Sequence, residues 1–343
     1  MMKVAMLQGP FAFSIEDQEQ PNPKPTEVVL KVAACGVCGT DVEAYLGHQP
    51  RGWTITYPFR MGHELAGTVI EAGSDVRDVK VGDRVVPDGR LPCGYCHYCR
   101  RGQFSACQNQ GYFSGGLSQY AAYPFRNLVK IPAEVSFEEA AMTEPLACVV
   151  NGQSKLSVTP GAIAVVIGDG PIGLMHMQML KHRGAYTVLV GVTPHRLEKA
   201  RQLGADAVAN NTTDDVAKMV REISEGRGAD VVVNAVGKAT ALKQAIDLAA
   251  RGGQVLFFAA TMQPAVELDI DLVHYKELAL RGTYDSTIAN SEDALNLIGK
   301  GIVKVAPLIS HRLPLTDVQQ GYEIARKLEG LKVLIIHEEG KTL

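Results

Sequence analysis

The sequence predicts an α/β protein with a β-rich N-terminal part followed by a doubly wound, parallel-sheet part. Up to about residue 150, Gly, Pro and short β-type runs alternate at short intervals, which is typical of an all-β region with long loops. From Pro160 onward, predicted strands alternate with predicted helices. Repeated βαβ units indicate a parallel sheet that is covered by helices on both faces.

The predicted elements follow in chain order. The N-terminal part contains β-type runs at Val28–Ala33, Leu65–Ala72, Asp83–Pro87 and Asn127–Ile131. The second part begins with a strand at Ala162–Ile167 and a helix at Pro171–Arg183, and a strand at Thr187–Gly191 precedes a helix at His195–Leu203. Further units lie at Ala207–Ala209, Asp214–Glu225, Val231–Asn234, Thr240–Ala250 and Gln254–Ala259. The chain is less regular after about residue 285, and Lys332–His337 is an apolar strand.

Size and composition are those of an ordinary globular enzyme. The 343 residues correspond to about two domains, and 46% of them are hydrophobic. The net charge is −3 and neither sign gathers into a block, which argues against nucleic-acid or membrane partners. Apolar runs are far shorter than the roughly 20 residues of a membrane span, and residues 1–13 do not resemble a signal peptide. We therefore expect a cytoplasmic protein with a small-molecule substrate.

A glycine-rich segment predicts a dinucleotide site. Gly168-Asp169-Gly170-Pro171-Ile172-Gly173 fits G-x-G-x-x-G, directly after a predicted strand and at the start of a predicted helix. The glycines permit a tight turn and close approach to a pyrophosphate, and the helix N-terminus offers unpaired N–H groups. We also assign Val236 and Gly237, after a later strand, to the cofactor site.

The end of the next strand bears on the choice between NAD and NADP. An acidic residue there would bind the ribose 2′-hydroxyl of NAD. Here the segment from Gly191 to Arg196 contains no carboxylate, whereas Thr193, His195 and Arg196 could contact a 2′-phosphate. We therefore favour NADP(H), with the alternative that Arg196 only flanks the adenine of NAD.

Four of the seven cysteines lie close together and predict a structural zinc site. Cys93, Cys96, Cys99 and Cys107 offer four thiolates in one loop, the donor set of a closed tetrahedral site. An iron–sulfur cluster takes the same ligands and is the chemical alternative. Disulfides are disfavoured because the cysteine count is odd and no small secreted domain is evident.

A second, dispersed set of residues offers zinc ligands with mixed chemistry. It comprises Cys38, His63, Glu64, Glu144 and Cys148. A catalytic zinc needs about three protein ligands and an open position. Taken one at a time, each of these residues has an ordinary structural interpretation, such as a buried thiol or a surface carboxylate.

The chain resembles the zinc-dependent medium-chain dehydrogenase/reductase superfamily over essentially its whole length. The resemblance rests on Cys38-Gly39-Thr40-Asp41, Gly62-His63-Glu64, Val81–Val85, the four-cysteine lobe, Gly115-Gly116-Leu117, Glu144-Pro145 and the late glycine motif, in family order. It implies a GroES-like β-rich catalytic domain over residues 1–150, completed by 288–343. It also implies a Rossmann NAD(P)-binding domain over 151–287, and a homodimer or homotetramer.

The resemblance implies roles for individual residues. Cys38, His63 and Glu64 would ligate the catalytic zinc, as in the sorbitol- and threonine-dehydrogenase branch, and Glu144 would be a further ligand or hold a water on the metal. Cys148 competes for that last role, and we rank Glu144 first because Glu-Pro-Leu is the polyol-type signature. Thr40 occupies the family's proton-relay position, with a purely structural threonine as the alternative.

The implied activity is hydride transfer between a secondary alcohol, such as a polyol or sugar, and NAD(P). A threonine-type amino alcohol or a simple secondary alcohol is the second choice of substrate. The sequence departs from better-known members at Leu46 and Glu43, where relay histidines are common, and at Asp285-Ser286, where animal sorbitol dehydrogenases have a substrate-binding pair. Candidate aromatics of the substrate pocket are Tyr45, Trp53, Tyr57, Phe113 and Tyr284. An inactive zinc- and nucleotide-binding protein, or a zinc-free reductase, would not need the dispersed ligand set.

Overall fold

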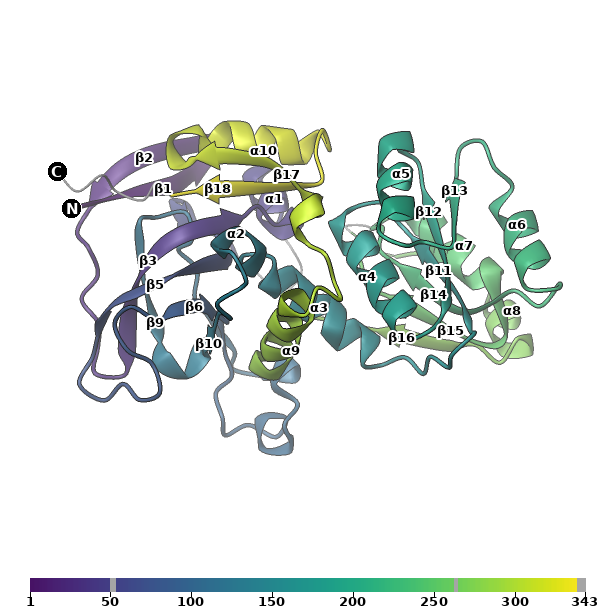
Figure 1. Cartoon of the computed structure of the whole chain (residues 1–343), viewed down its shortest axis with the longest axis horizontal. Helices are drawn as coiled ribbons and strands as arrows, with labels where there is room; N and C mark the ends of the chain where they lie inside the picture. The colour runs from purple at the N-terminus through teal and green to yellow at the C-terminus, as the bar shows by residue number, and fades with distance from the viewer. Residues whose placement is uncertain (50–53, 262–264, 338–343) are drawn as a thin grey trace. The chain divides into compact units, whose positions relative to one another are not determined.

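The computed structural model describes residues 1–49, 54–261 and 265–337. The chain divides into two compact units, which we describe separately. The first comprises residues 1–147, 286–300 and 305–343, and the second comprises residues 148–285 and 301–304. Figure 1 shows the elements of both. Among the described residues, no helix has the length and apolar character that a membrane span requires.

The first unit is built on a seven-stranded sheet of order β10-β6-β5-β3-β18-β17, with β9 also paired to β3. Its strands are β3 (Glu27–Gly36), β5 (Glu64–Ala72), β6 (Arg84–Pro87), β9 (Tyr120–Pro124), β10 (Leu128–Lys130), β17 (Ile309–Pro314) and β18 (Lys332–Ile336). All pairings are antiparallel except that of β17 with β18. The four β-type runs predicted in this part correspond to β3, β5, β6 and β10.

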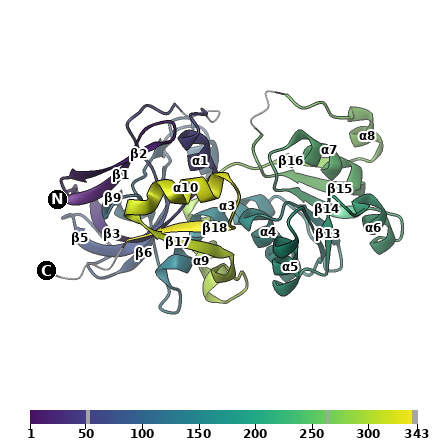
Figure 2. The same cartoon turned by 90° about the horizontal axis from the view of Figure 1, so that it is seen from above.

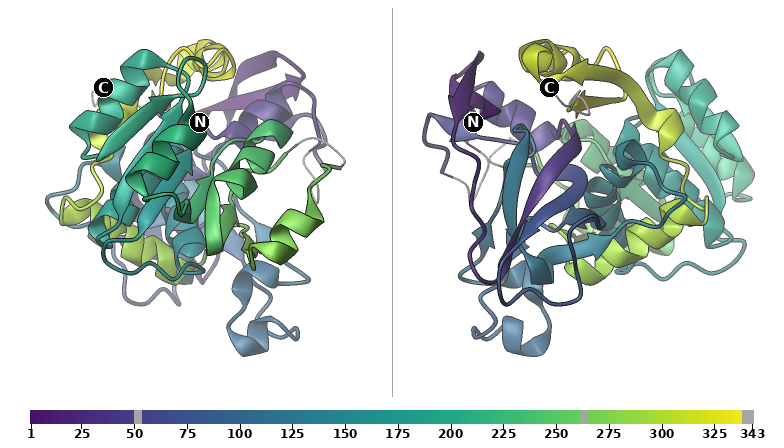
Figure 3. Two further views of the ribbon diagram at one scale, coloured as in Figure 1. Left: turned by 90° about the vertical axis from the view of Figure 1, so that its right-hand side faces the viewer. Right: turned by 60° about the vertical axis from the view of Figure 1, so that its left-hand side comes forward.

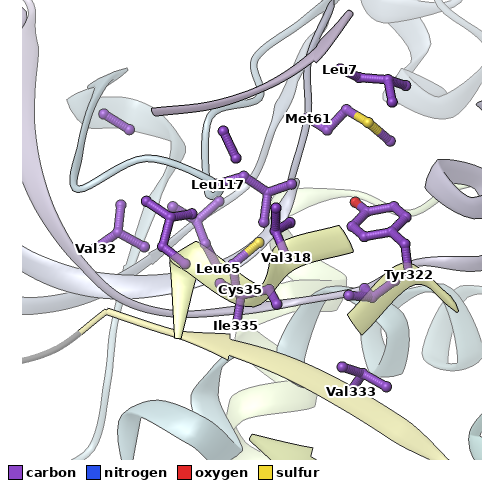
Figure 4. Packing of buried hydrophobic residues seen from close by; sticks show 14 of the residues in the cluster. Leu7, Val32, Cys35, Met61, Leu65, Leu117, Val318, Tyr322, Val333 and Ile335 are labelled. Carbon is purple, nitrogen blue, oxygen red and sulfur yellow. The ribbon is translucent and has the colours of Figure 1, made fainter. Parts of the chain in front are cut away.

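A smaller sheet lies beside it, in the order β2-β1-β4. It contains β1 (Met2–Gly9), β2 (Ala12–Gln18) and β4 (Phe59–Arg60). Apolar side chains from both sheets form one core, in which Leu7, Met61, Leu65, Leu117 and Ile335 are fully buried or nearly so (Figure 4). Helix α1 (Gly39–Tyr45) lies between β3 and β4 in the chain. After β10 come α2 (Phe137–Ala140) and α3 (Thr143–Gln153).

The part after residue 285 is more regular than its sequence pattern predicts. It forms α9 (Ile288–Gly299), β17, α10 (Val318–Arg326) and β18. Thr287 and Asn290 form a capping box that starts α9, and α10 buries Val318, Tyr322 and Ile324. Figures 1 and 3 show α10, β17 and β18 beside the N-terminal strands, whereas α9 contacts β10 and α2. The last strand, β18, pairs with β3 and so returns to the N-terminal sheet.

The second unit contains a parallel six-stranded sheet of order β13-β12-β11-β14-β15-β16. Its strands are β11 (Ile163–Ile167), β12 (Tyr186–Gly191), β13 (Ala207–Asn210), β14 (Ala229–Asn234), β15 (Ala249–Phe257) and β16 (Ala279–Gly282), and its helices are α4 (Pro171–His182), α5 (Pro194–Gln202), α6 (Val216–Ile223), α7 (Ala239–Leu248) and α8 (Ile270–Tyr275). Figure 2 shows α7 on one side of this sheet and α4 and α5 on the other. Every residue of β11 is buried, as in a strand covered on both faces.

The fold class is therefore the one predicted, with a β-rich unit and a doubly wound parallel-sheet unit. The predicted helices and strands of the second unit are all present, and their ends differ from the prediction by a few residues. Such shifts are usual because helix ends fray and terminal residues carry weak sequence signals.

Candidate active site

Antiparallel pairing of β3 with β5 brings three of the predicted zinc ligands together. Gly36, at the end of β3, is paired with Glu64, at the start of β5, so Cys38 and His63 lie at the same edge of the sheet. The ligand atoms of Cys38, His63 and Glu64 are all within 4.8 Å of one another. A thiol, an imidazole and a carboxylate at this spacing fit a zinc ion that keeps further positions open.

A buried acid lies behind the candidate ligand His63. Asp41 is 2% exposed, and its Oδ1 is 3.4 Å from Nδ1 of His63. Burial lowers the pKa of His63, but the charges of Asp41 and Cys38 outweigh it and raise that pKa well above its usual value. A carboxylate behind a ligating histidine orients the ring and increases its basicity. Sequence reasoning missed this role, although the three-residue spacing from Cys38 to Asp41 in the first turn of α1 was a usable signal.

A buried lysine completes the surroundings of Glu64. Leu334 of β18 is paired with Gly36, so Lys332, at the start of β18, reaches the same edge of the sheet. Its ammonium group forms an ion pair with Glu64 and donates a hydrogen bond to the carbonyl of Val37 at 3.0 Å. Burial opposes the charge, but Glu64, Cys38 and Glu144 outweigh it and raise the pKa of Lys332. No local sequence signal could have identified this residue, because only strand pairing brings it to the site.

Glu144 and Cys148 lie one turn apart on α3, both half-buried. Their ligand atoms are within 4.8 Å of each other and form a group separate from that of Cys38, His63 and Glu64. Glu144 nevertheless acts electrostatically on Lys332. Thr40 is half-buried in the first turn of α1, two residues after Cys38.

The four clustered cysteines form a compact thiol group. All four sulfur atoms lie within 4.8 Å of one another, with Cys93 and Cys99 Sγ atoms 3.9 Å apart. Backbone N–H groups of Cys99 and Gln108 lower the pKa of Cys96 to about 6, which favours the thiolate. The strands β7 (Arg90–Leu91) and β8 (Gly111–Tyr112) pair at the base of this loop. Four thiols at this spacing fit a closed tetrahedral zinc site.

The glycine-rich turn between β11 and α4 fits a pyrophosphate. Gly170 is the N-cap of α4, and no side chain caps that end, so its first N–H groups are available to an anion. A Cβ atom on Gly173 would lie 1.9 Å from the carbonyl oxygen of Gly168, so only glycine allows this close packing. Val236 follows β14 and lies beside the turn, where its side chain would be 3.0 Å from a Cβ on Gly168. Gly237 is the next residue of that loop.

The end of β12 holds the remaining predicted nucleotide residues. Gly191 ends the strand, and Thr193 is the N-cap of α5. His195 is exposed. Arg196 is only 6% exposed, and its Nη1 lies 3.7 Å from Oδ1 of Asp169.

The candidate pocket aromatics lie in different surroundings. Tyr45 is fully buried in the core, and its hydroxyl donates to Glu323 at 2.9 Å. The Tyr57 hydroxyl donates to the carbonyl of Ala44, and Phe113 packs on Tyr123. Tyr284 is exposed. Trp53 lies outside the described residues.

Comparison with known proteins identifies the family. The alcohol dehydrogenase GroES-like domain family matches residues 24–133, and the zinc-binding dehydrogenase family matches residues 171–300. A sorbitol dehydrogenase of Halalkalibacterium halodurans is 32% identical, over 95% of this chain and 96% of its own. An L-threonine 3-dehydrogenase of Bacillus velezensis is 31% identical, over 98% of this chain and 99% of its own.

A solved structure supports the same family. The crystal structure of a putative zinc-binding dehydrogenase from Sinorhizobium meliloti, bound to NADP, has a TM-score of 0.92 and 29% identity, and the match covers 98% of this chain and 99% of that one. Together with the thiol cluster, the mixed ligand group and the glycine turn, these similarities show that the chain belongs to the zinc-dependent medium-chain dehydrogenase/reductase superfamily.

Proposed function

We propose that this chain is a zinc- and NAD(P)-dependent dehydrogenase that interconverts a secondary alcohol, of the polyol or sugar class, and the corresponding ketone. The observation that carries the proposal is the convergence of Cys38, His63 and Glu64, backed by Asp41 and Lys332. A protein that used zinc only to hold its fold would need the thiol cluster but not this mixed group. The name of the sorbitol dehydrogenase relative supports the substrate class.

In the proposed site, the catalytic zinc is held by Cys38, His63 and Glu64. Glu144 is the preferred residue for the remaining role, as a further ligand or as the holder of a water on the metal, and Cys148 is the second choice. Cys93, Cys96, Cys99 and Cys107 hold the structural zinc. When bound, the catalytic zinc supplies Lewis acidity toward the substrate oxygen, and the nicotinamide supplies the hydride acceptor. Thr40 Oγ1 accepts the substrate hydroxyl proton while its own hydroxyl proton leaves toward solvent.

The nucleotide is assigned to the second unit. The turn Gly168–Gly173, including Pro171 and Ile172, binds the pyrophosphate, and Val236 and Gly237 border it. Gly191, Thr193, His195 and Arg196 surround the adenosine ribose. We favour NADP(H), because Arg196 lies in the first turn of α5, directly after β12, where an arginine accommodates the 2′-phosphate, and because the Sinorhizobium meliloti relative is bound to NADP in its crystal structure.

The chain is assigned two domains. Residues 1–150 with 288–343 form the catalytic domain, and 151–287 form the nucleotide domain. A homodimer or homotetramer is the assembly that the family resemblance implies. A cytoplasmic location is supported by the seven cysteines, none of which forms a disulfide.

A threonine-type amino alcohol is the second candidate substrate, favoured by the similarity to threonine dehydrogenases. The test is an activity panel of polyols, sugars, amino alcohols and simple secondary alcohols with NAD and NADP, together with zinc analysis. We expect two zinc ions per chain, and Cys38→Ser should lose one zinc and all activity. Cys35→Ser, which alters a buried thiol outside the ligand group, is the control and should keep both zinc ions and the activity.

Variants at Glu144 and Cys148 decide the last ligand. Glu144→Ala should lose catalytic zinc and Cys148→Ala should retain it; the reverse result would transfer the role to Cys148. Metal-replete protein that is inactive throughout the panel would contradict the proposed function.

A further inference from the structure

The carboxylate of Asp169 belongs to the glycine-rich turn in sequence, but it lies at the end of β12 in space. Its Oδ2 accepts hydrogen bonds from the backbone N–H groups of Val192, at 2.9 Å, and Thr193, at 2.8 Å. A Cβ atom on residue 191 would lie 2.5 Å from that of Asp169, so Gly191 leaves the room that this side chain occupies. The carboxylate is therefore held firmly against the start of the loop after β12.

This location matters because dinucleotide sites distinguish NAD from NADP at the end of their second strand. There, an acid binds the ribose 2′-hydroxyl, and an arginine accommodates the 2′-phosphate. The segment 191–196 contains no acid, yet the structure supplies one from the neighbouring turn. The same carboxylate faces the guanidinium of Arg196, with 3.7 Å between Oδ1 and Nη1.

The two charges act on a 2′-phosphate in opposite directions. Both side chains are largely buried, at 7% exposed for Arg196 and 10% for Asp169, so water screens them less than it screens surface charges. The carboxylate repels an added phosphate, offsets part of the charge of Arg196 and uses two N–H groups that an anion would otherwise receive. The arginine attracts the phosphate.

We propose that Asp169 is the specificity-determining residue of the nucleotide site: it discriminates against the 2′-phosphate, and the preference of the chain is the net result of Asp169 and Arg196. This inference rests on the proposed nucleotide-binding function. It places the discriminating acid in the glycine-rich turn instead of on the second strand.

The experiment measures binding by calorimetry, independently of turnover, with NAD and NADP and with the fragments AMP and adenosine 2′,5′-bisphosphate. Asp169→Asn is the central variant, because an amide oxygen still accepts the N–H groups of Val192 and Thr193 while the charge is removed. The affinity ratio of NADP to NAD should rise at least about tenfold, and the ratio for the two fragments should rise with it. Arg196→Gln should lower both ratios.

Asp206→Asn is the matched control. Asp206 also accepts a backbone N–H of β12, from Thr187 at 2.8 Å, and pairs with Lys181, but it lies at the opposite end of the strand. It should leave both ratios unchanged. Asp169→Ser, whose hydroxyl is also an acceptor, serves as a second variant if Asp169→Asn does not fold.

The outcomes separate the two proposals. If the wild-type chain binds neither nucleotide, the proposed function is wrong. If both nucleotides bind but the folded Asp169 variants keep the wild-type ratio, or if Asp206→Asn shifts it equally, the role of Asp169 is refuted and the proposed function stands.

Discussion

Removing the ammonium group of Lys332 should lower the free energy of unfolding of the metal-free protein more than removing that of a surface lysine. The side chains of Lys332 and Glu64 are 7% and 2% exposed, so Lys332→Met leaves a carboxylate buried without its cation. Breaking a buried ion pair from one side costs about 3–5 kcal/mol. For a cooperative unit of 150–250 residues this corresponds to a fall in Tm of about 10 °C.

The assay is urea unfolding with zinc removed by a chelator and again with zinc restored. Zinc should reduce the loss of unfolding free energy in Lys332→Met, because the metal gives the Glu64 carboxylate a new positive partner. The double variant Lys332→Met/Glu64→Gln should recover much of the stability, since it removes the uncompensated charge. Lys181→Met is the control: its pair with Asp206 has side chains 45% and 20% exposed, so its loss should be about 1 kcal/mol or less.

An equal free energy of unfolding for metal-free Lys332→Met and metal-free Lys181→Met would contradict this prediction. A difference in unfolding free energy between Lys332→Met and wild type that zinc does not reduce would contradict it as well. In either case the pairing of Lys332 with Glu64 would not be what stabilises this edge of the sheet.

Three further variants test other parts of the structure. Cys107→Ser should reduce bound zinc from two ions to one per chain by elemental analysis, because one of four clustered thiols is lost; unchanged stoichiometry would contradict a four-thiolate site. Asp41→Asn should weaken binding of the catalytic zinc about 10–100-fold in a chelator competition, because Asp41 supports His63, and wild-type affinity would exclude that role. Burial lowers the pKa of His176 from 6.5 to about 3. Between these two pH values the unfolded chain binds a proton that the folded chain does not. The free energy of unfolding therefore falls as the pH drops below 6.5, by up to about 1.4 kcal/mol per pH unit. His176→Gln should flatten the dependence of the unfolding free energy between about pH 6 and pH 4, and an identical slope would contradict this.

Local sequence determined the features whose residues are close together in the chain. The glycine turn from Gly168 to Gly173 is recognisable because a buried strand, a tight turn and a helix follow within a few residues. The four-cysteine loop is recognisable because its ligands share one segment. The parallel sheet followed from strand–helix alternation, since each βαβ unit is itself a short stretch of sequence. The individual site residues stay predictions until the variants are measured.

Only the tertiary structure decided which distant residues share a site. Pairing of β18 with β3 brings Lys332 to Glu64, and no periodicity in either segment encodes that neighbour. The fold of the glycine turn places the carboxylate of Asp169 against Val192 and Thr193, although the sequence from 191 to 196 contains no acid. The physical reason is that hydrogen-bonded register and burial place charges by through-space distance, whereas sequence patterns report only on neighbours along the chain.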